Sequence, residues 1–176
     1  MAKYKIIDNF LDQENFLNIK QAIVTSGNFP WYITENVSGT TGDSDYYFTH
    51  LIYKDHSINS SYYNIIKPIV DKLNVFALRR IKANFYPSTK EIIKHAYHID
   101  HPTPNTGSIY YINTNNGKTI LDDGTEVESI ENRLLIFEAN VKHRSTTCTD
   151  DPIGRFNINF NYFPTKENKQ YKGFAQ

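Results

Sequence analysis

The sequence predicts a mainly β protein (α+β) built as a sandwich or jelly roll. Aromatic residues make up 14% of the chain, with 13 Tyr and 11 Phe, and such residues favour pleated, half-buried strands over helical bundles. From residue 75 onward, short apolar segments alternate with turn residues, the spacing typical of an all-β core. Since 176 residues suit a single core, we expect one domain, with a helix-and-strand support region at 1–74 and a β core at 75–163.

Residues 1–74 combine helical and extended patterns. The segment 4–7, "YKII", is expected to be extended, and Asp12 is placed to cap a helix in which Phe16, Ile19 and Ile23 recur at helical spacing and Gly27 marks the end. A second helix is expected over 60–74, with Pro68 either kinking it or marking its first turn. Between the helices, strands are expected at 31–34 and 45–53, and the Gly- and Ser-containing loop 35–44 is a candidate flexible lid.

The β core is predicted from seven strand-like segments. The turns "TNNG" and "DDG" contain residues that accept positive φ, so we expect both to close hairpins. The expected strands cover residues 75–86, 91–98, 106–113, 118–121, 125–130, 132–137 and 154–163.

Charge and composition narrow the possible functions. The chain has 19 basic and 19 acidic residues and a pI near 7.0, so it lacks the basic field that nonspecific nucleic-acid binding needs. Its one cysteine, Cys148, rules out an internal disulfide and a Cys-rich zinc site. No apolar run approaches the roughly 20 residues that span a bilayer, and "MAKYKIIDNF" has no apolar signal region. We expect a soluble, cytoplasmic protein without nucleic-acid or membrane partners.

The last predicted strand has one polar and one apolar face. In "RFNINFNYF", Arg155, Asn157, Asn159 and Asn161 alternate with aromatic and aliphatic residues, and alternate residues face opposite sides of a sheet. Two interpretations remain open here. The polar side could face water, or it could line a pocket inside the roll while the aromatic side packs under the N-terminal helices.

The segment "HAYHIDHP", residues 95–102, is a candidate metal site. His98 and Asp100 leave the same face of an extended segment, and His143, which follows the strand "NRLLIF", is the natural third ligand. Two histidines and one carboxylate on one triangular face form the site of nonheme Fe(II) oxygenases, although a surface turn also explains His-x-Asp alone. Arg155 follows at the start of the final strand, where a guanidinium could grip a carboxylate with two parallel hydrogen bonds.

Together these motifs resemble the Fe(II)/2-oxoglutarate-dependent oxygenase superfamily, within it the small prolyl 4-hydroxylase-like branch. The matching pieces are "NFYP", "HID", "SIYYIN", "GKTILDDG", "NRLLIFEANVKHRS" and "GRFNINFNYF", in the family's order over roughly residues 81–163. The resemblance implies a double-stranded β-helix with helices packed on one sheet. It also implies His98, Asp100 and His143 as iron ligands and Arg155 on the distal carboxylate of 2-oxoglutarate.

The resemblance extends to three further cosubstrate residues, with two departures. Tyr111 matches a tyrosine that hydrogen-bonds the same carboxylate, and Tyr86 matches a pocket tyrosine near the cosubstrate. Asn157 stands where a serine or threonine is frequent, and His95 stands where many relatives carry a tyrosine. These departures put details of the pocket in doubt and leave the metal triad untouched.

The implied activity is that of a dioxygenase using Fe(II), 2-oxoglutarate and O₂ to hydroxylate a prolyl residue, an amino acid or another small substrate, with release of succinate and CO₂. Two alternatives stay open: a nonredox cupin-like metal-binding protein or isomerase, and a structural jelly roll whose histidines are incidental. For substrate contact we consider Trp31, Tyr32, Tyr46 and Tyr47, which could equally be packing aromatics. We expect His50, His56 and His101 at the surface, and His95 near the pocket.

Overall fold

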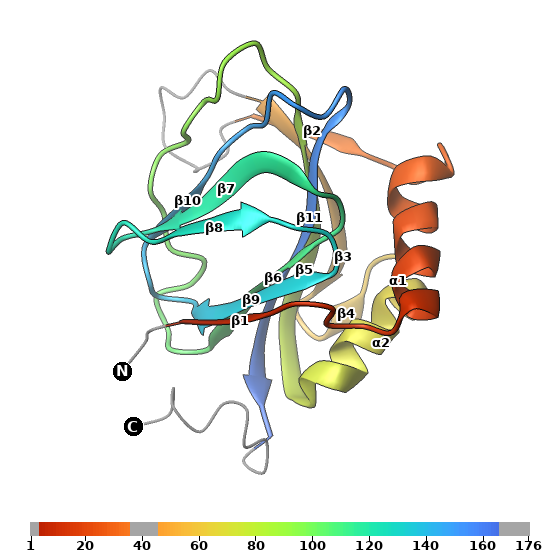
Figure 1. The fold of residues 1–176 in the computed structure, drawn as a ribbon. Helices are drawn as coiled ribbons and strands as arrows, with labels where there is room; N and C mark the ends of the chain where they lie inside the picture. The colour runs from red at the N-terminus through yellow and green to blue at the C-terminus, as the bar shows by residue number, and fades with distance from the viewer. Residues whose placement is uncertain (1–3, 36–45, 166–176) are drawn as a thin grey trace.

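Two antiparallel sheets form the body of the protein in the computed structural model, which describes residues 4–35 and 46–165 (Figure 1). The large sheet has the order β1-β9-β6-β11-β5-β3-β2, with β4 paired to β3, and the small sheet has the order β10-β7-β8. The large-sheet strands are β1 Tyr4–Ile7, β2 Tyr32–Glu35, β3 Tyr46–Lys54, β4 Ser57–Ile58, β5 Val75–Pro87, β6 Thr106–Tyr111, β9 Arg133–Glu138 and β11 Gly154–Pro164. The small sheet contains β7 Asn115–Leu121, β8 Glu126–Ser129 and β10 His143–Ser145.

The helices cover the face of the large sheet that points away from the small sheet (Figure 1). Helix α1, Gln13–Lys20, begins where Asp12 accepts a hydrogen bond from the Asn15 backbone at 2.9 Å, and it continues as a π-helical turn, η1, over Gln21–Thr25. Gly27 follows with a φ of 69°, as its expected role at the helix end requires. Helix α2 spans Tyr63–Leu73, and Pro68 lies in its interior rather than in its first turn.

Strand β11 lies between β5 and β6 and divides the interior into two parts. Its apolar face, Phe156, Ile158, Phe160 and Tyr162, packs under the helices with residues such as Ile19 and Ile69. A smaller apolar cluster between the two sheets contains Ile109, Tyr111, Val127, Leu135 and Phe137. The mainly β, jelly-roll prediction with helices packed on one sheet is thus confirmed.

Two predictions about individual segments were wrong. Residues 91–98 form no regular strand; they run beside β10 through two isolated bridges, Lys94–Thr146 and His98–His143. The turn "TNNG" closes no hairpin, because β6 pairs within the large sheet and β7 within the small one, so this segment carries the chain between sheets. The "DDG" turn does join the paired strands β7 and β8, with Gly124 at a φ of 86°.

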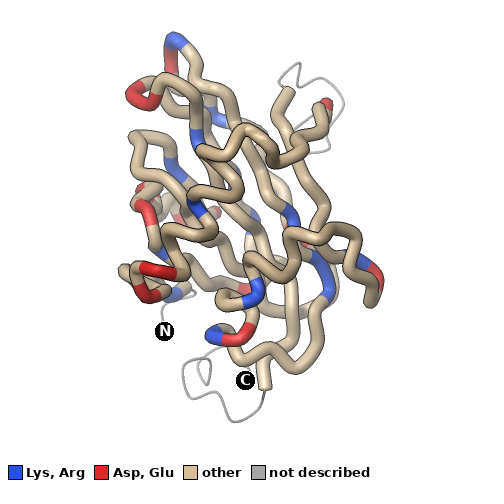
Figure 2. The backbone as a smooth tube through the Cα atoms, turned by 90° about the vertical axis from the view of Figure 1, so that its right-hand side faces the viewer, with Lys and Arg blue, Asp and Glu red and all other residues tan. Residues whose placement is uncertain are grey.

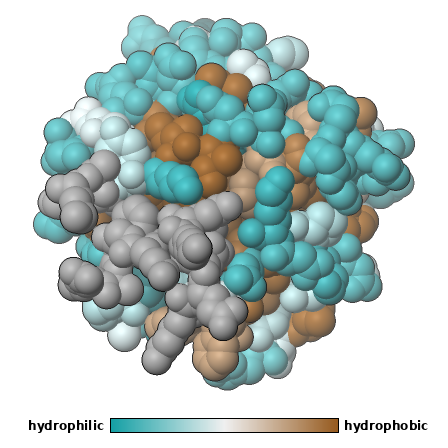
Figure 3. Space-filling model, turned by 60° about the horizontal axis from the view of Figure 1, so that its bottom comes forward, coloured by the Kyte–Doolittle hydropathy of each residue, from teal (hydrophilic) through white to brown (hydrophobic). Residues whose placement is uncertain are grey.

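The described surface is mixed in charge and hydropathy. Basic and acidic positions occur together over the face in Figure 2, and Figure 3 shows small apolar patches among hydrophilic side chains. Among the described residues, no helix is long and apolar enough to cross a membrane.

Candidate metal and cosubstrate site

The backbones of His98 and His143 pair with each other in an isolated antiparallel β-bridge. The backbone N–H of each donates to the carbonyl of the other at 2.9 Å, so the two residues form a hydrogen-bonded cross-strand pair. Side chains of such a pair leave the same face of the sheet, and the two imidazole rings accordingly lie with centroids 4.6 Å apart. The geometry arises from backbone pairing between segments that are distant in sequence.

Asp100 is held by side chains of the two central strands. Arg80 on β5 donates to its Oδ1 at 3.0 Å, and Asn159 and Asn161 on β11 donate to its Oδ2 at 2.9 and 3.1 Å. Burial raises the pKa of Asp100, but the charges of His143 and Arg80 and the two amide hydrogen bonds outweigh it, so the pKa is about 2. Asp100 is therefore a fixed carboxylate at neutral pH.

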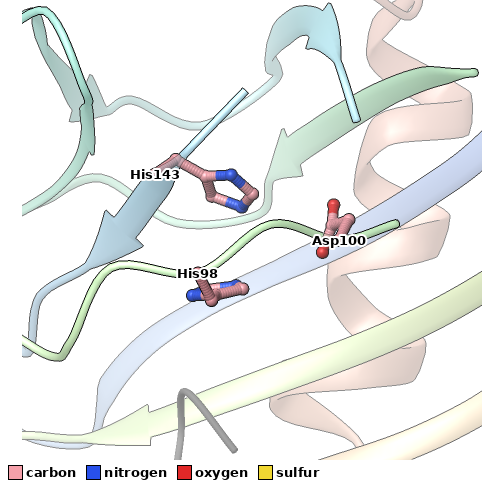
Figure 4. A group of neighbouring side chains, drawn as sticks. All are labelled: His98, Asp100 and His143. Atoms are coloured by element: carbon pink, nitrogen blue, oxygen red, sulfur yellow. The ribbon is translucent and has the colours of Figure 1, made fainter. Parts of the chain in front are cut away.

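His98, Asp100 and His143 point toward one another (Figure 4), with one potential ligand atom of each lying within 4.8 Å of the others. Burial, together with the charge of His143, lowers the pKa of His98 to about 4, so this imidazole is neutral at pH 7 and its lone pair is available. The Nδ1 of His143 lies 3.0 Å from the Val141 carbonyl, which fits Nδ1 as the donor and leaves Nε2 for a ligand. The donor set and its protonation fit a divalent metal ion.

Arg155 lies fully buried at the other end of the same pocket, with an exposed fraction of 0%. Its guanidinium donates to the Ser129 hydroxyl at 2.6 Å and the Thr119 hydroxyl at 2.9 Å, and it packs between the rings of Tyr86 and Tyr111. No Asp or Glu within residues 4–35 and 46–165 forms an ion pair with it. A buried guanidinium without a carboxylate is suited to bind an anion from outside the chain.

The other expected cosubstrate residues also lie around this pocket. The Tyr111 hydroxyl donates to Thr119 at 2.8 Å, next to Arg155, and Tyr86 stacks against His95 with ring centroids 5.4 Å apart. Asn157 lines the pocket and accepts a hydrogen bond from the Asn84 side chain at 2.9 Å. The polar face of β11 therefore lines a pocket, as one of the two interpretations of that strand stated.

Among the residues considered for substrate contact, Tyr47 lies on the pocket side of the large sheet and Trp31 lies on its helix side. Tyr47 stacks on Tyr86 at the pocket side of the sheet, with centroids 5.4 Å apart. Trp31 packs against Phe85 and Phe156 in the helix-side core, which agrees with the packing role left open for it. Tyr32 is exposed on the edge strand β2, and Tyr46 is exposed at the start of β3. The candidate lid, residues 35–44, lies outside the described residues after position 35.

The remaining histidines differ in their surroundings. His95 is buried and its Nδ1 lies 2.9 Å from the Ser145 hydroxyl, beside the pocket as expected. His56 is exposed, whereas His50 is buried under a 2.6 Å contact between its Nδ1 and the Pro30 carbonyl, so the surface prediction for His50 was wrong. His101 is half-buried rather than solvated, because its Nε2 contacts the Arg79 guanidinium.

Sequence reasoning missed the contribution of β5 to the pocket. Lys82, Asn84 and Tyr86 all line it, and Arg80 holds Asp100 from the same face. The signal was present in "RRIKANFY", where polar residues at 80, 82, 84 and 86 alternate with apolar ones, as on β11. Of these residues only Tyr86 was predicted to lie near the cosubstrate, because it belongs to the motif "NFYP".

The two-sheet roll and its helical cover are the fold of the Fe(II)/2-oxoglutarate-dependent oxygenases, including prolyl hydroxylases. No protein-family model and no curated protein sequence matches the chain. The likeness in fold comes from solved structures that share little sequence identity with the chain.

One similar structure is a prolyl hydroxylase from Trichoplax adhaerens in complex with a peptide fragment of the hypoxia inducible factor oxygen degradation domain. It shares 16% identity at a TM-score of 0.61, covering 99% of this chain and 87% of that one. An oxidoreductase of the 2OG-Fe(II) oxygenase family from Burkholderia pseudomallei matches at 12% identity and a TM-score of 0.68, covering 92% and 85%. The epimerase SnoN, solved with Fe3+, alpha ketoglutarate and nogalamycin RO, matches at 10% identity and a TM-score of 0.63, covering 92% and 79%.

Proposed function

We propose that the protein is an Fe(II)- and 2-oxoglutarate-dependent dioxygenase that hydroxylates a small molecule or a peptide residue. The observation that carries the proposal is the presence, in one pocket, of the His98, Asp100 and His143 cluster and of the buried guanidinium of Arg155. The first could hold a metal and leave open coordination positions; the second could hold a dicarboxylate beside it.

His98, Asp100 and His143 would hold Fe(II), which together with 2-oxoglutarate and O₂ supplies oxidation of a substrate C–H bond coupled to formation of succinate and CO₂. The chain contributes orientation and protonation state. Arg80, Asn159 and Asn161 keep the Asp100 carboxylate ionised and fixed, and the backbone pairing of the two histidines fixes the spacing of their rings.

The Arg155 end of the pocket supports a dicarboxylate cosubstrate. Ser129 and Thr119 accept hydrogen bonds from the guanidinium and so orient its remaining N–H groups, while the Tyr86 and Tyr111 rings flank it. Charge-assisted hydrogen bonds in such a site are stronger than in water, because competing solvent is excluded. Tyr111 and Asn157 are proposed as neighbours of the bound carboxylate.

A nonredox metal-binding protein or isomerase with the same fold is the second candidate. The metal cluster alone would serve either function. The buried Arg155 favours the oxygenase, since a buried guanidinium with no acidic partner among the described residues costs free energy that a resident carboxylate cosubstrate would offset.

Anaerobic titration tests the proposal directly. The protein is loaded with Fe(II), 2-oxoglutarate is added, and the metal-to-ligand absorption band of the chelate is recorded, followed by succinate release on exposure to O₂. We expect both signals in the wild type and in the His56→Ala control, whose histidine is exposed, and neither in His98→Ala. Tight metal binding without any 2-oxoglutarate-dependent band would favour the nonredox alternative.

A further inference from the structure

Lys82 lies in the pocket but has no part in the roles proposed above. It projects from β5 into the same pocket as His98 and Asp100, and its register partner on β11 is Asn159, which holds Asp100. Its ammonium donates to the Tyr47 hydroxyl at 3.0 Å and lies 5.2 Å from the centroid of that ring. Lys82 is therefore fixed near the metal ligands by a contact with β3.

In the part of the chain that the structure describes, the charge of Lys82 has no ion-pair partner. Asp100 is the one acidic side chain among the described residues that line the pocket, and Arg80 already pairs with it. Burial lowers the pKa of Lys82, because its ammonium form is disfavoured away from water.

Lys82 and Arg155 enter the pocket from separate positions along the sheet. Arg155 pairs with Tyr86, and Asn159 pairs with Lys82, so the backbones of Lys82 and Arg155 stand four residues apart in register, about 13 Å along the strands at a rise of roughly 3.3 Å per residue. In the proposed function Arg155 holds a carboxylate of the cosubstrate, and no anion is assigned to Lys82. Even with both 2-oxoglutarate charges and a divalent metal present, the pocket keeps an excess of positive charge.

Two buried acceptors lie on the same inner face as Lys82. The side-chain oxygens of Asn84 and Asn159 line the pocket region and have no hydrogen-bond partner among the described residues. A buried acceptor without a partner costs free energy, so a ligand that carries an N–H or O–H donor would be favoured here. A cation beside free acceptors suits a small molecule that combines a carboxylate with a donor.

We infer that Lys82 recognises the carboxylate of the substrate, and that the substrate is a free amino acid or hydroxy acid rather than a residue inside a peptide. This inference rests on the proposed function, because it assigns the substrate class of that same site. Lys82 would determine specificity, with Asn84 and Asn159 accepting hydrogen bonds from the amino or hydroxyl group of the acid.

The test measures binding without turnover. Protein loaded with Zn(II) and 2-oxoglutarate is titrated calorimetrically with a panel of free L-amino acids and small hydroxy acids, and with the same compounds as primary amides. We expect at least one acid to bind tenfold or more tightly than its amide. Lys82→Met should abolish that preference and Lys82→Arg should retain it, while the affinity for 2-oxoglutarate changes less than threefold. Lys67→Met, on the exposed side of α2, is the matched control.

The possible results separate the sources of the carboxylate. A tenfold or greater loss of 2-oxoglutarate affinity in Lys82→Met would assign Lys82 to the cosubstrate and overturn the inference. Equal binding of acids and amides, or no binding of any acid, would overturn it too. A merely structural role for Lys82 would lower the melting temperature in Lys82→Met without altering the acid-to-amide ratio. If 2-oxoglutarate fails to bind the wild type, the proposed function is wrong. The titration of the Zn(II) protein with acids and amides would still test whether Lys82 binds a carboxylate.

Discussion

Replacing Arg155 by Met should weaken cosubstrate binding by at least two orders of magnitude while leaving the metal site intact. The guanidinium touches none of the three candidate ligands; its contacts are Ser129, Thr119, the Thr146 carbonyl and two aromatic rings. Two charge-assisted hydrogen bonds to a carboxylate contribute about 1.5–3 kcal/mol each. Their loss corresponds to a rise in the 2-oxoglutarate Kd of roughly 150-fold to more than 10,000-fold, at 1.4 kcal/mol per tenfold.

The same substitution should cost the cosubstrate-free protein little stability. Breaking a buried ion pair leaves an unpaired charge, but Arg155 has no acidic partner among the described residues, so Met removes a charge rather than stranding one. The hydroxyls of Ser129 and Thr119 lose an N–H donor, at about 1 kcal/mol each, and keep their own donor capacity. We expect a change of at most about 2 kcal/mol in the free energy of unfolding.

Calorimetric titration with Fe(II) or Zn(II) and then with 2-oxoglutarate measures both affinities, and urea unfolding measures stability. Arg155→Lys keeps the charge without the two-pronged geometry and should give an intermediate Kd. Arg133→Met is the control, since Arg133 pairs with the exposed Asp8 at 2.6 Å. A 2-oxoglutarate Kd within tenfold of the wild type in Arg155→Met would refute the assignment of Arg155.

Three further predictions concern the metal site and the backbone. His143→Ala should weaken Zn(II) binding by more than the roughly 10–100-fold typical of an outer-shell partner, measured by competition with a chelating dye, and unchanged affinity would remove His143 from the ligand set. Asn159→Leu should weaken Zn(II) binding by about 10-fold in the same dye competition, because one of two amide donors to Asp100 Oδ2 is lost. A loss as large as that of His143→Ala would contradict an indirect role for Asn159. Gly154→Ala should lower the urea midpoint of unfolding far more than Gly27→Ala. Both glycines have positive φ, but a Cβ at residue 154 would lie 2.2 Å from the Tyr86 carbonyl oxygen, whereas nothing lies within 4 Å of a Cβ at residue 27. Equal midpoints for the two variants would contradict this steric reason.

Much of the fold could be predicted because local patterns set it. The alternation on β11 and the N-cap at Asp12 act within a few residues, and the structure has both. Strand pairing is less local. The "TNNG" segment has the composition of a hairpin turn, yet β6 pairs with β9 and β11, and only those distant partners decide which sheet each strand joins. The same holds for residues 91–98, whose strand-like composition yields only isolated bridges.

At the candidate site, motif residues could be predicted and supporting residues could not. The side-chain types of the motif residues His98, Asp100 and His143 already indicate a metal site. Whether Lys82 contributes to the pocket depends instead on which face of β5 turns inward. Lysine on a strand usually reaches solvent, and only the half-buried position of Lys82 in the pocket makes its charge informative. His50 shows the converse: nothing in its neighbourhood in the sequence predicts that Phe29 and the Pro30 carbonyl will cover it.

Strand β11 links stability to the site, because each of its faces is buried for a different reason. Residues Gly154–Tyr162 are all buried, including the polar side chains of Arg155, Asn157, Asn159 and Asn161. Burying four polar side chains costs free energy, and the hydrogen bonds that they make to Ser129, Thr119, Asn84 and Asp100 offset only part of it. An apolar strand of similar shape would pack as well or better between the two sheets. Stability alone therefore gives no reason for this polar face, whereas the proposed function would give one, with a metal bound at Asp100 and an anion bound at Arg155.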